Sequence, residues 1–143
     1  MTTQPAEDTR VAVVVDSAQG GPGLLGNTIA TIAIGLGAAA PQLGGPQLVD
    51  RAGYAVQPSA TVPVPVLQAD PDVLRELLAR ALQGDQGRIV VAFPGFARSM
   101  HDFPAYQLEF ARRDLVTEDL HGVGLAGPRK WVASLTGSLR LLR

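Results

Sequence analysis

Three neighbouring polar residues, Asn27, Thr28 and Thr31, are the first candidates for chemistry in this chain. They lie near the beginning of a predicted apolar helix. Unpaired backbone N–H groups and the helix dipole favour an anion at such an end, and side-chain amides or hydroxyls can orient it. The alternative is that Asn27 and Thr28 only satisfy the first turn of the helix.

A second group lies near the C-terminus, where no acidic residue follows Asp119. Arg129 and Lys130 begin the last predicted helix, and Thr136 and Ser138 follow at its end. Cations at a helix start can hold a phosphate or carboxylate, although such cations often pair with acids elsewhere. We expect the two groups to share a cleft, with the charged part of a small anionic or acyl-conjugated ligand at the second group and its acyl part along the first.

Residues 21–26 also match G-x-G-x-x-G after a strand, and Asp50 lies downstream where a ribose-binding acid can occur. In the dinucleotide-binding turn the first glycine closes the strand directly, whereas residues 17–20 intervene here. Pro22 also removes one N–H from the turn. The pattern is weak support for a nucleotide, and no cofactor is expected.

Composition excludes several other sites. The chain has no cysteine, which rules out disulfides, zinc thiolates and thiol nucleophiles. His101 and His121 are too far apart in sequence to suggest a metal site. The net charge of −1 argues against a generally basic nucleic-acid binder. The basic C-terminal end leaves RNA as a weakly supported partner.

The first candidate group is positioned by a strand over residues 10–15, a glycine-rich turn and a helix over residues 24–39. No charged residue occurs between Asp16 and Asp50. A backbone of that length must satisfy its polar groups within the fold, so we expect this helix to be mostly buried. The stretch is short for a membrane span and contains Asn27, Thr28 and Thr31, so no membrane partner is expected.

The rest of the chain alternates strands and helices. Hydrophobic spacing and turn residues predict a hairpin over residues 47–56, an extended edge segment with two prolines over 61–67, a helix over 70–82, an inner strand over 88–93, and helices over 102–113 and 128–136. The order predicts a three-layer α/β sandwich with a small mixed, mostly parallel sheet. Residues 1–9 are expected to be a disordered tail and residues 10–143 a single domain. No signal peptide is visible, which favours a cytoplasmic location.

Two blocks resemble a known family. They are residues 10–37 and the small-residue, Gly-Pro and Thr-Gly-Ser-Leu segments within residues 122–142. Over residues 10–143 the chain resembles a bacterial domain-of-unknown-function family, number 2000. That family in turn resembles the type II peptidyl-tRNA hydrolases, whose chains end in a similar way. The resemblance implies the small α/β sandwich of those hydrolases.

The hydrolase resemblance implies a lysine after a glycine at the start of the first helix, and an Asp-x-Gly-x-Thr loop. Gly26 matches the glycine, but Asn27 stands in place of the lysine, and Lys130 is the only lysine of the chain. The loop has no counterpart, since Asp114 and Thr117 have the wrong spacing. An amide supplies a dipole where an ammonium supplies a charge. Ordinary peptidyl-tRNA hydrolysis is therefore not expected.

Three functions remain open. The first is a binding protein for an anionic or acyl-conjugated ligand in a cleft between the first helix and the Thr-Gly-Ser turn. The second is a diverged esterase- or amidase-like hydrolase acting on an acyl-tRNA or a related conjugate, with Asp16 or His121 as base. The third is a structural or oligomer-forming protein, a homodimer for example, in which the Gly/Ala-rich helix is the interface. No catalytic residue is assigned.

Overall fold

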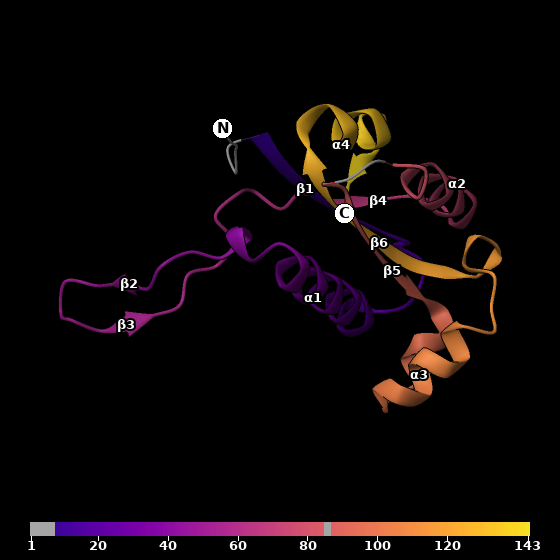
Figure 1. Cartoon of the computed structure of the whole chain (residues 1–143), viewed down its shortest axis with the longest axis horizontal. Coiled ribbons are helices and arrows are strands. Elements are labelled where there is room, and N and C mark those ends of the chain that lie inside the picture. The colour runs from indigo at the N-terminus through magenta and orange to yellow at the C-terminus, as the bar shows by residue number, and fades with distance from the viewer. Residues whose placement is uncertain (1–7, 85–86) are drawn as a thin grey trace.

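The computed structural model describes residues 8–84 and 87–143 and forms a sheet between two layers of helices (Figure 1). In chain order the elements are β1 (Thr9–Val15), α1 (Pro22–Ala39), η2 (Pro41–Leu43), β2 (Leu48–Val49), β3 (Ala55–Val56), β4 (Val66–Gln68), α2 (Pro71–Ala81), β5 (Ile89–Pro94), η3 (Gly95–Ser99), α3 (Phe103–Phe110), η4 (Leu115–Thr117), β6 (Leu120–Pro128), α4 (Arg129–Thr136) and β7 (Arg140–Leu141). The predicted tail lies, through residue 7, outside the described residues, and β1 begins at Thr9.

The main sheet has the strand order β5-β6-β1-β4-β7. The predicted three-layer α/β fold with a mixed sheet is confirmed. The expectation of mostly parallel pairing is wrong, because only β1 and β4 pair in parallel. The pairs β1–β6, β5–β6 and β4–β7 are antiparallel. Element order alone did not reveal that β6 returns between β5 and β1.

Alternation along β1 divides the core into two layers. Val11, Val13 and Val15 point to the face covered by α1, where they pack with Ile32 and Leu36. Ala12 and Val14 point to the opposite face, which α2 and α4 cover with an apolar cluster that includes Leu74, Leu78, Trp131 and Leu135. A central strand with both faces buried has a continuous apolar sequence, and residues 11–15 have such a sequence.

Small residues on β6 allow α1 to lie close to the sheet. A Cβ atom on Gly124 would lie 2.3 Å from Cγ2 of Ile32, and one on Gly122 would lie 2.8 Å from Cδ1 of the same residue. The glycines of β6 therefore allow a close approach of helix and strand.

The structure corrects two expectations about burial. Residues 88–93 were expected to form an inner strand, but β5 is an edge strand that pairs only with β6. Helix α1 was expected to be mostly buried, yet Thr28, Ile32 and Leu36 are its buried residues, and Ile34 is 72% exposed. One helical stripe is enough to attach α1 to the sheet, so its remaining apolar residues lie on the surface.

The other predicted elements are present with shifted ends. Helices α2, α3 and α4 fall within the predicted ranges, and the Asp102 carboxylate caps α3 by accepting from the backbone N–H of Ala105. The hairpin of β2 and β3 is present. In the predicted edge segment, the strand itself is β4, which begins after Pro65 and lies between β1 and β7.

By length and composition, α1 is the helix of the described residues that could cross a membrane. This is weak support for a membrane span, because the core helices of soluble proteins pass the same test. Here α1 covers one face of the sheet.

Candidate functional site

Several loops meet where three strands end. Strands β1, β4 and β5 point in the same direction, so their C-terminal ends share one edge of the sheet. The segment from Asp16 to Gly21 leaves β1 there, η3 follows β5 there, and β6 begins there with Leu120 and His121. Polar residues at such an edge are well placed to meet one another.

Gln19 connects these segments. Its Nε2 donates to the backbone oxygen of Asp16 at 2.8 Å and to that of His121 at 2.9 Å. Both amide hydrogens are thereby used, which fixes the orientation of the side chain and leaves Oε1 as an acceptor. That oxygen faces Thr28 and Arg98.

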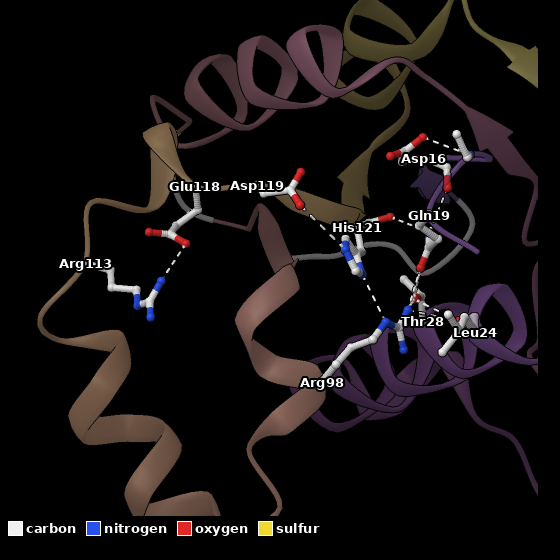
Figure 2. Close-up of polar contacts among 10 residues, drawn as sticks. Asp16, Gln19, Leu24, Thr28, Arg98, Arg113, Glu118, Asp119 and His121 are labelled. Carbon is white, nitrogen blue, oxygen red and sulfur yellow. Dashed lines mark hydrogen bonds and ion pairs between the residues drawn. The ribbon is translucent and has the colours of Figure 1, made fainter.

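Arg98 reaches from η3 between His121 and the first turns of α1 (Figure 2). Its Nε donates to Nδ1 of His121 at 3.0 Å, and its Nη1 donates to Oδ1 of Asn27 at 3.3 Å. Its Nη2 contacts three oxygens, namely Oε1 of Gln19, Oγ1 of Thr28 and the backbone oxygen of Leu24. The guanidinium is thus held by η3, α1 and β6 together.

All of these acceptors are neutral. Among residues 8–84 and 87–143, no carboxylate lies within ion-pair distance of Arg98. The guanidinium instead lies over the ring of Phe93, 5.0 Å from its centroid. A partly buried cation that keeps its full charge attracts an anion, and one Nη1 hydrogen remains available to bind it.

His121 acts as an acceptor toward Arg98. Its side chain is 15% exposed, and burial, followed by the charge of Arg98, lowers its pKa from about 6.5, although Asp119 and Asp16 partly oppose this. Since Nδ1 accepts, we assign the proton to Nε2. The distance of 3.8 Å from Nε2 to Oδ2 of Asp119 is too long for a hydrogen bond. A general base needs a free lone pair, and the Nδ1 lone pair of His121 is already occupied by the hydrogen bond from Arg98.

A pocket of about 660 Å³ opens beside Arg98, between α1 and α3. The floor is β5, and the polar lining includes Asn27 and Thr31 from α1. The apolar lining comes from all three elements and the loop before α3: Leu24, Ile32, Val91, Phe93, Met100, Phe103 and Tyr106. An apolar pocket of this size with a few converging polar groups is typical of small-molecule sites.

The structure brings together only the first group of predicted site residues. Asn27 and Thr31 line the pocket, and Thr28 is fully buried behind it. Thr31 also donates to the backbone oxygen of Asn27 at 2.9 Å. These three residues lie where the sequence placed them, near the start of the first helix.

The second predicted group lies elsewhere, so the expected shared cleft is wrong. Arg129 and Lys130 begin α4 after Pro128, which pairs with Thr9 at the far end of β1. Helix α1 instead follows the end of β1 at Val15, which pairs with Gly122. The two helices also cover opposite faces of the sheet.

The turn after α4 returns to the first edge, but it lies apart from the pocket. The Thr136 hydroxyl donates to the backbone oxygen of Val132 at 2.8 Å. Ser138 lines a separate hollow of about 210 Å³ with Ser17 and Asp70. The Thr-Gly-Ser turn and the pocket residues of α1 therefore do not line one shared cleft.

Other sequence candidates are explained by local structure. Gly23 and Gly26 lie within α1, so residues 21–26 do not form a phosphate-binding turn before the helix. Asp50 closes the β2–β3 turn, where its Oδ1 accepts from the N–H groups of Ala52 and Tyr54. Asp16 accepts from the N–H of Ala18 at 2.9 Å. No group of three metal-ligating side chains occurs among the described residues.

Sequence reasoning missed Gln19 and Arg98, the two residues that organise the site. A usable signal was present for Arg98, because it follows Pro94 at the end of an apolar strand. Polar residues just after strand ends are frequent ligand contacts in α/β folds. Gln19 offered the same signal, since it follows the end of β1, but its role depends on the backbone oxygens of Asp16 and of His121, which lies 102 residues away in the sequence.

The family described as "Protein of unknown function (DUF2000)" matches residues 9–143. No curated protein matches the sequence. Among solved structures, the chain is similar to the protein of unknown function Atu0240 from Agrobacterium tumefaciens strain C58, with a TM-score of 0.82 and 21% identity. That match covers 94% of this chain and 97% of the other, and at this identity it shows the fold alone. Because the family match spans nearly the whole sequence, the chain belongs to the DUF2000 family of proteins of unknown function.

Proposed function

We propose that this protein binds a small ligand with an anionic group and an apolar body in the pocket between α1 and α3. The observation that carries the proposal is Arg98, a partly buried cation at the edge of that pocket whose hydrogen-bond acceptors among the described residues are all neutral. The amide of Asn27, already in contact with the guanidinium, adds a second polar group. The anion is thus recognised by Arg98 in place of the predicted Arg129 and Lys130.

The rest of the pocket defines the other part of the ligand. Phe93, Phe103 and Tyr106 provide aromatic walls, and Leu24 and Ile32 add aliphatic contacts from α1. The volume of about 660 Å³ is within the range that holds drug-sized ligands. A carboxylate or phosphate on an acyl chain or aromatic ring satisfies both halves of the site.

The proposal is tested by calorimetric titration with octanoate, octyl phosphate and octanamide, which share one chain and differ in charge. In the wild type we expect both anions to bind at least about tenfold more tightly than the amide, since hydrogen bonds to a charged partner are worth about 1.5–3 kcal/mol. Arg98→Met should remove this preference and leave octanamide binding unchanged.

Arg129→Met is the matched control, because it removes a cation at the opposite edge of the sheet. It should retain the preference for anions. Equal affinity of octanoate and octanamide for the wild type would refute the proposed site.

A diverged hydrolase of the type II peptidyl-tRNA hydrolase kind is the second candidate. One contact favours it: Arg98 donates to Asn27, so a cation lies beside the position where the resembling family has its lysine. The Nδ1 lone pair of His121 already accepts from Arg98, so His121 is not free to act as the base of a hydrolase, and this favours binding over hydrolysis. We expect no turnover of N-acylated aminoacyl-tRNA, whereas turnover that Arg98→Met abolishes would favour the hydrolase.

A further inference from the structure

The hairpin of β2 and β3 stands away from the rest of the molecule as an arm, which we define as residues 45–60 (Figure 1). It is attached at its base, where the N–H of Thr61 donates to the backbone oxygen of Leu43 at 2.8 Å. Four large apolar residues of the arm are each more than half exposed: Leu48, Val49, Tyr54 and Val56. A lone two-stranded hairpin is marginally stable in water, so such an arm calls for a partner surface.

Helix α1 offers a second unpartnered surface next to the base of the arm. Its open face, which we define as Ala30, Ala33, Ile34 and Ala38, follows helical spacing and is exposed along the helix. Beside it, Ala33 and Ile34 line an apolar groove of about 300 Å³ with Pro58 and Ala60 from the arm. The arm and the open face are therefore continuous parts of one surface.

Charge and length indicate what covers this surface. From Ser17 to Ala69 the only charged residues are Asp50 and Arg51, at the tip of the arm. A membrane-surface helix carries lysine or arginine along its polar face, and α1 has none. Depletion of charge is instead typical of the core of a protein interface.

The dimensions fit a second copy of this chain. One limb of the arm, residues 45–51, spans about 23 Å as extended chain, which is long enough to reach along the open face, whose residues 30–38 cover about 14 Å of α1. In a two-fold dimer the arm of each copy lies along α1 of the other, so one association covers both exposed surfaces twice. The arm and the open face together supply about 20 residues per copy, as a standard interface requires.

We propose that this protein is a two-fold dimer in which each β2–β3 arm lies on the open face of α1 in the partner copy. The proposal is independent of the ligand site, because the arm is remote from Arg98 along α1. The proposal predicts that the arm and the open face of α1 become buried when two copies of the chain associate.

Sedimentation velocity between about 1 and 100 μM tests the proposal. The wild type should be dimeric, and the double variant Val49→Asp/Tyr54→Asp should be monomeric, with its dissociation constant raised at least about 100-fold by two charges in an apolar interface. Leu108→Asp is the control, since Leu108 is 66% exposed on α3, away from the arm. It should remain dimeric.

Deletion of residues 47–56 gives a second variant that should be monomeric and folded, because the arm contributes no side chain to the two core clusters. The absence of cysteine allows a direct check of the contact. Mixed and oxidised Tyr54→Cys and Ile34→Cys proteins should form a covalent dimer, whereas Leu108→Cys mixed with either should not. A monomeric wild type, a dimer that survives both arm variants, or a monomer that binds lipid vesicles through α1 would each overturn the proposal.

Discussion

Neutral hydrogen-bond acceptors hold the Arg98 side chain in place without neutralising its positive charge. Gln19 accepts from its Nη2 while donating both amide hydrogens to backbone carbonyl groups, and the buried hydroxyl of Thr28 contacts the same Nη2. Replacing such neutral acceptors with a carboxylate would form an ion pair and remove the attraction for an external anion. The charge of the site is thus preserved by the choice of amides, a hydroxyl and an uncharged imidazole.

The pH dependence of stability should report on His121. Its pKa is lowered in the folded state, chiefly by burial, so between that value and about 6.5 the unfolded chain binds more protons. Stability contributed by the neutral imidazole is then complete above about pH 6.5 and is lost as the pH falls below it. In urea unfolding, acidification should lower the free energy of unfolding more for the wild type than for His121→Asn, whose side-chain oxygen can still accept from Arg98.

The exposed histidine of the same chain provides the control. His101→Asn should keep the pH dependence of the wild type, because its ring is exposed at the mouth of the pocket. If His121→Asn and the wild type respond equally to acidification, then His121 is not held neutral by its surroundings.

At the residue scale, sequence reasoning located those residues of the candidate site whose position is a local feature. Asn27, Thr28 and Thr31 were recognised because helix starts have a known chemistry that depends on adjacent positions. The sequence analysis placed Arg129 and Lys130 in the same cleft as Asn27. This was wrong because the distance between them depends on strand pairing, which the sequence does not show. The register Thr9↔Pro128 places them at the wrong edge.

Among the elements, β6 determines how closely α1 can lie on the sheet. Gly124→Ala should destabilise the protein by about 1–3 kcal/mol, because its Cβ would clash with Ile32 in a packed core. Gly26→Ala is the matched substitution, since a Cβ there meets nothing within 4 Å. It should stabilise by about 0.5–1 kcal/mol through helix propensity.

Equilibrium urea unfolding measures both effects, provided that the dependence of the free energy of unfolding on urea concentration is the same in the variants and the wild type. Equal and small changes for Gly124→Ala and Gly26→Ala would mean that α1 can move away from β6 without cost, contrary to the close packing described here.

Patterns within one element predicted the helices and the hairpin well, because hydrophobic spacing and turn residues are local signals. They failed for β5, since an apolar run shows that side chains avoid water and does not show what covers them. Val91, Ala92 and Phe93 of this edge strand form the floor of the pocket between α1 and α3. They failed for α1 as well, because the absence of charge on its outer face does not show whether the protein itself covers that face.

The whole molecule combines a central strand pair with an outlying arm. Strands β1 and β6 pair through seven registered residues from Thr9↔Pro128 to Val15↔Gly122, between two apolar layers. The arm has only the short pairing of β2 with β3 and no buried side chain. Local stability should therefore differ strongly between these two parts, since it follows buried contacts and protected hydrogen bonds.

Native-state hydrogen exchange on Val49→Asp/Tyr54→Asp tests this difference in a chain whose arm cannot be protected by association. Amides of Val13 and Leu125 should exchange only through global unfolding, so that their protection matches the free energy from urea. The amide of Asp50, which donates across the hairpin to the oxygen of Tyr54 at 2.9 Å, should exchange through local opening and far faster. If the wild type forms the proposed dimer, the same amide should exchange more slowly in it as the protein concentration rises, while the amides of β1 and β6 keep the larger protection throughout. An Asp50 amide as slow as that of Leu125 in the monomeric variant would mean that the arm unfolds together with the core, and that its exposed apolar residues are no sign of a missing partner.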